Sequence, residues 1–146
     1  MTRFFTLRQA EQLLPQVETA IRQAIAAQAE YREAESASQD FQRRVMLEGG
    51  MRVDHGKLLE RKQRRETSAQ HLKQALEKIH EYGCLVKDLE IGLIDFPTLF
   101  NGEEVYLCWK LGEPAIQFWH GVEEGFRGRK AIDQEFLDHH QGDLPN

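Results

Sequence analysis

The side chains with the most reactive chemistry fall in the C-terminal part of this 146-residue sequence. They comprise a thiol, an imidazole, three carboxylates and an indole. These candidate pocket residues are Asp88, Asp95, Cys108, Glu113, Trp119 and His120. Zinc accepts thiolate, imidazole and carboxylate together, so this composition permits a metal site. None of these residues has the short CxxC or HExxH spacing of such a site, so we predict no metal, and neither a cofactor nor a catalytic residue is indicated.

Cys108 is the candidate nucleophile, because only a thiolate attacks efficiently. A strand pairing that sets Asp95 opposite Cys108 would raise the pKa of the thiol, since a nearby negative charge disfavours the thiolate. Lys110 on the same face would act in the opposite direction. With only Cys84 in addition, the chain has too few cysteines for a disulfide scaffold. We therefore expect two reduced thiols, with Cys108 either packed or at the surface.

A glycine-rich basic loop follows these residues and contains Arg127 and Arg129. Backbone N–H groups of such a loop can converge on an anion, and guanidinium groups can grip a phosphate or carboxylate in bidentate fashion. The loop lacks the GK[ST] ending of a P-loop and the GxGxxG spacing of a dinucleotide site. Either the two arginines bind an anionic ligand, or they clamp the loop to carboxylates such as Asp95 and Glu113. We favour the clamp.

Two turns organise the strands that must position these groups. Asn101-Gly102 predicts a tight hairpin, because both residues tolerate positive φ. It pairs Phe96 with Leu107, Ile94 with Trp109 and Asp95 with Cys108. A second turn at Gly112-Glu113-Pro114 would pair Trp109 with Ile116, Leu107 with Phe118 and Val105 with His120.

These pairings predict the two faces of the sheet. Ile94, Phe96, Leu107 and Trp109 would face the core, with His120 at the margin. The other face would carry Asp95, Tyr106, Cys108, Lys110, Gln117 and Trp119. Cys108 and His120 would then point in opposite directions. A slip of one residue would exchange the faces, because side chains alternate along a strand.

The preceding sequence predicts two long helices. Thr6 and Gln9 form a capping box, so a helix should begin at Leu7 and run to about Leu47, with a kink at Pro15. Gly49-Gly50 should break it. A second helix should run from about Val53 to Tyr82 and stop at Gly83. Its predicted apolar seam comprises Leu58, Lys62, Arg65, Ala69, Leu72, Leu76 and Ile79.

If the chain reverses at Gly50, Ile21 faces Ile79 and Ala24 faces Leu76 across the hairpin. The same reversal sets Glu30, Glu33 and Glu35 beside Arg61, Arg64 and Arg65, as charges flank the seam of a coiled coil. This gives the basic run a structural role. The arms are longer than a small sheet can cover, so we expect a homodimer.

The predicted fold is α+β: a long antiparallel two-helix hairpin with a C-terminal three- to four-stranded antiparallel β-meander. We expect a single domain over residues 1–146, with the hairpin at about 6–82, the meander and arginine loop at about 84–132, and a short helix or tail at 133–146. His139-His140 should lie in a solvated or frayed terminus.

Charge and hydropathy narrow the function classes. The net charge is −5, which makes nucleic acid an unexpected partner. No apolar run approaches the length of a membrane span, so we expect no membrane partner and a cytoplasmic location.

Both ends of the chain resemble a known family. The matching segments are 5–7, 13–15, 86–88, Gly92–Pro97, Leu107–Trp109, Gly112–Pro114, Trp119–Gly121 and Gly125–Arg129. They are similar to small uncharacterised bacterial proteins catalogued as a domain of unknown function. The resemblance implies that the chain is a member of that family. It indicates no mechanism.

Two function classes remain. The first is a non-enzymatic, homo-oligomeric interaction or assembly module, in which the arms dimerise and the face with Tyr106 and Trp119 meets a protein partner. The second is a small enzyme or ligand sensor with an anion- or metal-binding pocket at the helix–sheet junction. They differ in whether the polar residues converge on one concavity.

Overall fold

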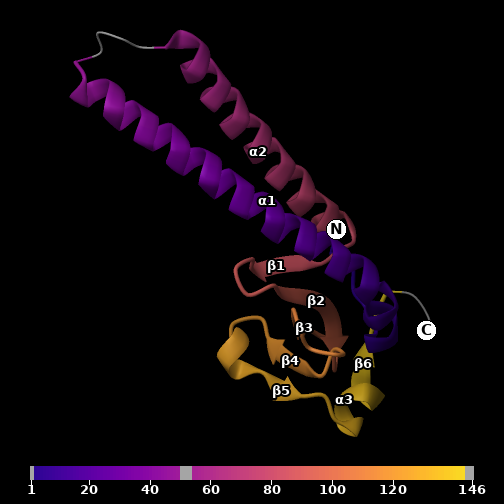
Figure 1. The fold of residues 1–146 in the computed structure, drawn as a ribbon. Helices are drawn as coiled ribbons and strands as arrows, with labels where there is room; N and C mark the ends of the chain where they lie inside the picture. Colours follow the sequence, from indigo (N-terminus) through magenta and orange to yellow (C-terminus); the bar gives the residue numbers. More distant parts are fainter. Residues whose placement is uncertain (1, 50–53, 144–146) are drawn as a thin grey trace.

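The computed structural model of the protein describes residues 2–49 and 54–143 and places two long helices against one antiparallel sheet (Figure 1). Helix α1 spans Leu7–Leu47 and helix α2 spans His55–Glu81. The predicted α+β class is confirmed. The predicted break at Gly50 and the predicted start at Val53 lie outside the described residues. In residues 2–49 and 54–143, neither long helix carries an apolar stretch that could cross a membrane.

Local signals set the ends of both helices. Thr6 accepts a hydrogen bond from the Gln9 N–H, and the Gln9 side chain accepts one from the Thr6 N–H, so the predicted capping box is present. Pro15 lies inside α1, which continues past it. Asp54 caps the start of α2 through the Lys57 N–H. Gly83, with φ of 95°, follows its end.

The hairpin is antiparallel, as the charged pairs across it show. Glu33 Oε1 lies 3.5 Å from Arg64 Nη2, and Glu30 Oε2 lies 4.0 Å from His71 Nδ1. The Glu33–Arg64 pair was predicted from a reversal near Gly50. Both pairs are solvated and contribute little to stability.

The predicted seam of α2 is wrong in its distal half. Lys62 and Ala69 are exposed, whereas their neighbours Arg61 and Ser68 turn inward. Arg65 is half-buried, as predicted. The inward positions follow a period of about 3.6 residues, while the predicted ones follow the 3.5-residue repeat of a coiled coil, and the two drift apart by about 20° per heptad.

In the part of the chain that the structure describes, six strands form one antiparallel sheet with the order β1-β2-β3-β4-β5, and β6 pairs with the C-terminal end of β2. The prediction of three to four strands was too low, because it omitted two strands of two residues each. The strands are β1 (Leu85–Asp88), β2 (Leu93–Phe100), β3 (Glu103–Lys110), β4 (Phe118–Gly121), β5 (Lys130–Ala131) and β6 (His140–Gln141).

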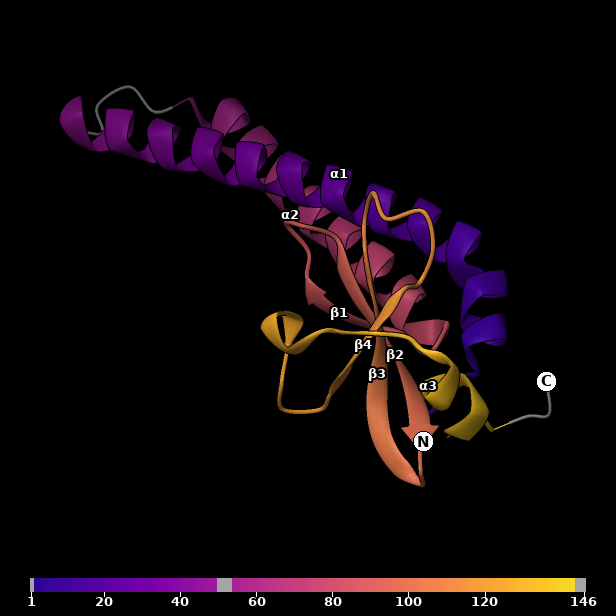
Figure 2. The same ribbon diagram turned by 90° about the horizontal axis from the view of Figure 1, so that it is seen from below.

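The β2–β3 hairpin has the predicted register. Asn101 and Gly102 have φ angles of 53° and 81° at its turn. The predicted pairs all occur: Phe96 with Leu107, Ile94 with Trp109 and Asp95 with Cys108. The face with Ile94, Phe96, Leu107 and Trp109 is buried in the core. Figure 2 shows both long helices on the same side of the sheet.

The β3–β4 register differs from the prediction by one residue. The observed pairs are Val105 with Gly121, Tyr106 with His120, Leu107 with Trp119 and Cys108 with Phe118. The cause lies in the connection, where the Glu113 N–H donates to Lys110 O and the Trp109 indole N–H donates to Glu113 O. These bonds fold the chain locally after Lys110, so the ladder resumes only at Phe118.

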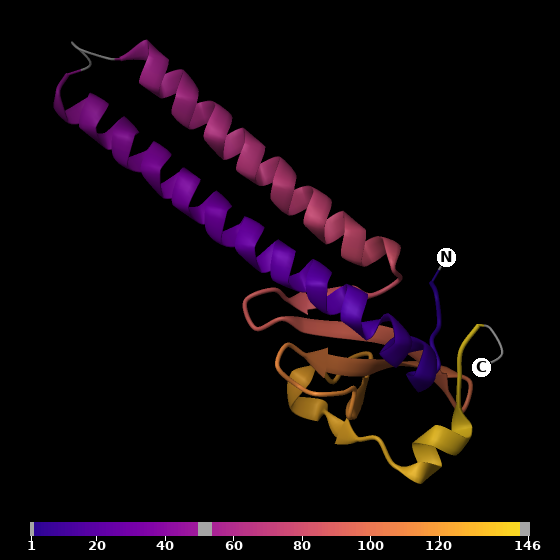
Figure 3. The same ribbon diagram turned by 45° about the vertical axis from the view of Figure 1, so that its right-hand side comes forward.

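The C-terminal segment is packed rather than frayed. His139 is exposed, in line with the predicted solvated terminus, whereas His140 is half-buried, contrary to it. A 3-10 turn (Phe126–Gly128) leads through β5 to the short helix α3 (Gln134–His139). In β6, His140 accepts a hydrogen bond from the Leu7 N–H at the start of α1. The Asp143 N–H donates to Phe4 O, so the two terminal segments lie side by side (Figure 3).

Candidate functional site

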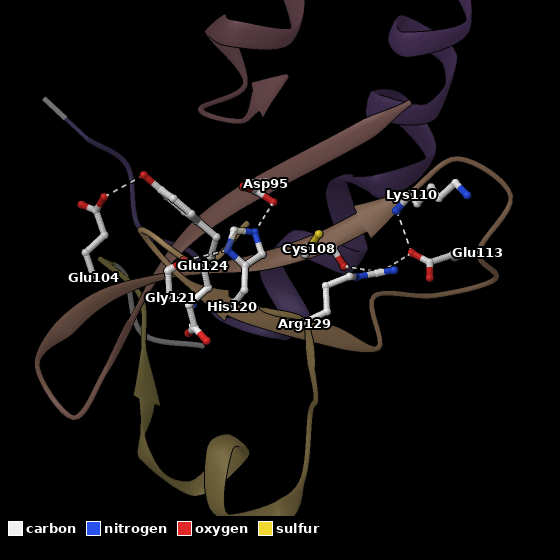
Figure 4. A network of polar contacts seen from close by, with 10 residues as sticks. Asp95, Glu104, Cys108, Lys110, Glu113, His120, Gly121, Glu124 and Arg129 are labelled. Carbon is white, nitrogen blue, oxygen red and sulfur yellow. Dashed lines mark hydrogen bonds and ion pairs between the residues drawn. The ribbon is translucent and has the colours of Figure 1, made fainter. Parts of the chain in front are cut away.

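Three reactive side chains meet on the face of the sheet that points away from the helices. Asp95, Cys108 and His120 come from β2, β3 and β4, which are neighbours in the sheet. One ligand atom from each lies within 4.8 Å of the other two. The relative exposures are 0%, 0% and 2%. Figure 4 shows the His120 ring directed at the Asp95 carboxylate, with the Cys108 sulfur nearby.

This arrangement corrects the sequence prediction. We expected Cys108 and His120 on opposite faces, which argued against a metal site. The observed pairing of Tyr106 with His120 moves the imidazole to the face of Cys108. The alternation along residues 116–121 is compatible with both registers, so the sequence alone could not have located the cluster.

The hydrogen bonds of His120 fix where its proton lies. Its Nδ1 is 2.7 Å from Gly121 O, and a carbonyl oxygen only accepts, so Nδ1 carries a proton. Its Nε2 lies 3.0 Å from Asp95 Oδ1. A neutral ring would therefore direct a lone pair at a carboxylate oxygen. A shared proton or a cation must lie between these two atoms.

Burial controls the ionisation of the other two groups. It raises the pKa of Asp95 above the ordinary value, although the nearby His120 acts in the opposite direction. Burial also raises the pKa of Cys108 to about 12, with a further contribution from the negative charge of Asp95. Near neutral pH the Cys108 thiol is therefore protonated in the metal-free protein, which argues against a nucleophilic role.

A second polar network lies next to the first and is centred on Arg129. Its guanidinium donates to Glu113 Oε1 at 2.6 Å and to Cys108 O at 3.3 Å. It also lies over the Phe118 ring, 4.1 Å from the centroid. The same Glu113 oxygen accepts the Lys110 N–H at 2.7 Å. Arg129 thus joins the loop after β4 to the β3–β4 turn, with the carboxylate partner expected for a clamp.

The remaining candidates lie elsewhere. Arg127 is exposed and makes no hydrogen bond or ion pair with any residue that the structure describes. Asp88 is exposed at the end of β1, where its side chain accepts the Glu90 N–H. Trp119 lies on the opposite face from His120 and packs against Phe100. The polar residues therefore divide into two networks and three separate positions.

A cleft of about 500 Å³ does occur at the helix–sheet junction. Its lining includes Glu11, Arg22, Trp109, Glu113 and Pro114. Of the candidate residues only Glu113 borders it, and that carboxylate is already paired with Arg129. The candidates therefore do not converge on this cleft.

Comparison with known proteins gives one match. The sequence model of the DUF2203 family, described as an uncharacterised conserved protein, matches residues 3–132. No curated protein and no solved structure matches the chain.

Proposed function

This chain belongs to DUF2203, a family of uncharacterised conserved proteins, and we propose that it is a non-enzymatic interaction module whose projecting hairpin pairs two copies of the protein. The observation that carries the proposal is the apolar end of the hairpin. Met46 and Leu47 are 82% and 80% exposed there, and Leu58 and Leu59, near the start of α2, are exposed as well.

The arrangement of the polar residues supports a non-enzymatic role. An active site needs reactive groups that share a concavity with the substrate. Asp95, Cys108 and His120 are instead buried within the sheet, and Arg129 is committed to Glu113. These contacts serve the fold more directly than they serve a reaction.

The position of the hairpin supports an interaction role. Figures 1 and 3 both show its distal half extending well beyond the sheet. No other described element covers the exposed side chains of Met46, Leu47, Leu58 and Leu59, which we call the apolar tip. Exposed apolar groups gathered at one place are typical of protein contact surfaces.

Charge argues that the partner is a second copy of this chain. The stretch 30–40 of α1 is acidic, because four carboxylates stand there against Arg32, which is itself paired with Glu90 at 2.6 Å; two arginines, Arg43 and Arg44, follow nearer the end of the helix. Those carboxylates are Glu30, Glu33, Glu35 and Asp40. The facing part of α2 is basic, with Lys57, Arg61, Lys62, Arg64 and Arg65 outnumbering Glu60 and Glu66.

A two-fold axis along the arms would use both features. It would set the acidic part of α1 beside the basic part of the partner's α2, and the reciprocal contact would follow by symmetry. The Glu33–Arg64 pair within one chain shows that the two segments lie at the same height along the hairpin. The same axis would bring the two apolar tips together.

Sedimentation velocity at micromolar concentration tests the proposal. The wild-type protein should sediment with twice the chain mass. The double variant Met46→Glu/Leu47→Glu should sediment as a monomer, because it would place like charges in the tip contact. Its circular dichroism should be unchanged, since both side chains are exposed.

The matched control is Val122→Glu, which alters an exposed apolar residue far from the tip. This variant should remain dimeric. A wild-type monomer at tens of micromolar would overturn the proposal, as would a double variant that dimerises like the wild type.

A further inference from the structure

We propose that Asp95, Cys108 and His120 form a zinc site that joins the three central strands of the sheet. The inference is independent of the proposed self-association. It rests on the donor atoms, on the orientation of His120 and on a buried carboxylate oxygen that no nitrogen or oxygen donor satisfies.

The donor set fits zinc. Thiolate, imidazole and carboxylate are the three side-chain ligands that Zn²⁺ commonly takes. The three ligand atoms already lie within 4.8 Å of one another. Hard cations such as Mg²⁺ and Ca²⁺ prefer oxygen ligands throughout, so the thiol and imidazole select against them.

The orientation of His120 is that of a metal ligand. Its Nδ1–H donates to Gly121 O at 2.7 Å, which holds the ring in place and leaves Nε2 as the coordinating atom. A ligating histidine usually donates its other N–H to a carbonyl or carboxylate in this way. Nε2 faces Asp95 Oδ1, 3.0 Å away.

Asp95 supplies an independent observation. Its Oδ2 is buried and accepts no hydrogen bond from a nitrogen or oxygen donor among the described residues, and the whole side chain is 0% exposed. The Cys108 thiol is the other hydrogen-bonding group beside this carboxylate. A thiol is a weak donor, so a buried carboxylate oxygen left to it alone is costly. A cation at the cluster would satisfy it.

The charges of the ligands match that of the ion. A carboxylate, a thiolate and a neutral imidazole together carry two negative charges, which balance the dication, so zinc would add no uncompensated charge to the buried face. The ligands bind in these forms, and any protons that they carry are released to solvent when the ion binds.

The site would hold β2, β3 and β4 together on the face that the long helices leave uncovered. The described chain supplies three ligands, and a water would complete the tetrahedron. No change of oxidation state is involved, because Zn²⁺ has no redox chemistry in proteins.

Metal analysis of the wild-type protein provides the first test. Protein expressed with zinc and passed over a weak chelating resin should retain equimolar zinc. Protein refolded with Co²⁺ in place of zinc should show the near-ultraviolet thiolate-to-cobalt charge-transfer band and the visible bands of a tetrahedral ion. Both measurements use the unmodified chain, so they do not depend on a variant that folds.

Two substitutions then assign the ligands. Cys108→Ser should abolish the charge-transfer band, whereas Cys84→Ser, which changes the other buried thiol, should leave the band and the zinc content unchanged. Asp95→Asn should lose the metal but fold, because its amide N–H can donate to His120 Nε2 in place of the shared proton. Added zinc should raise the melting temperature of the metal-free wild-type protein and not that of Asp95→Asn.

Three outcomes would overturn the proposal. They are wild-type protein that retains no zinc and shows no cobalt bands after refolding, a band that survives Cys108→Ser, and equal zinc content in the wild-type protein and Asp95→Asn. In the first case, a proton shared by Asp95 and His120, and not a metal ion, would lie between the two side chains.

Discussion

His120 lies directly across the β3–β4 ladder from Tyr106, and this pairing decides which face of the sheet carries the imidazole. The two rings meet edge to face, with centroids 5.6 Å apart. Had His120 paired with Val105, as we predicted, the ring would point toward the long helices. The pairing with Tyr106 brings it instead to within hydrogen-bonding distance of Asp95.

The Arg129 clamp predicts a loss of stability in Arg129→Lys. Lysine keeps the charge but cannot reproduce the contacts to Glu113, Cys108 O and the Phe118 ring together. We expect a loss of about 1–3 kcal/mol in the free energy of unfolding. Urea denaturation measures it.

The matched control for the clamp is Arg127→Lys, two residues earlier in the same loop and exposed. It should change the free energy of unfolding by less than about 0.5 kcal/mol. Equal losses in the two variants would show that Arg129 is no clamp. A wild-type melting temperature raised by phosphate, with no rise in Arg129→Lys, would favour the anion-binding alternative.

The aromatic cluster around Phe136 predicts that the C-terminal segment adds to global stability. Phe136 is buried and stacks on Phe100, Trp119 and His140. Phe136→Ala should lower the free energy of unfolding by about 3–5 kcal/mol, since it leaves a cavity. The neighbouring Leu137 is 37% exposed, so Leu137→Ala should cost less than about 1 kcal/mol. Similar costs in a thermal melt would mean that α3 does not anchor on this cluster.

We predict that the buried Cys84 thiol makes the free energy of unfolding depend on pH. Burial raises the pKa of its thiol from 9.0 to about 12. Between these values the unfolded chain loses the thiol proton while the folded chain keeps it, so the folded state binds more protons and stability falls as pH rises. The loss from this group has a slope of up to about 1.4 kcal/mol per pH unit.

Denaturation of wild type and Cys84→Ala across this pH range measures that slope. The stability advantage of the wild type should shrink from pH 9 toward pH 12. An advantage that stays constant would show that the Cys84 thiol is not shielded from ionisation.

The amino-acid sequence determined the elements whose signals are local. The capping box at Thr6 and Gln9 set the start of α1, and Asn101-Gly102 set both the β2–β3 turn and its register. In each case the decisive contacts join residues a few positions apart, so the pattern carries the geometry. This is why the pairing of Asp95 with Cys108 could be predicted.

The tertiary structure decided the features that depend on distant contacts. The β3–β4 register is set by the fold of the connection around Glu113, and the place of the C-terminal segment by the bond from the Leu7 N–H to His140. Along the hairpin, the inward face of α2 follows the straight-helix period instead of the heptad. A strand pattern repeats every two residues and fits two registers equally, so only packing selects one. That selection, and no motif, brings His120 to Asp95 and Cys108.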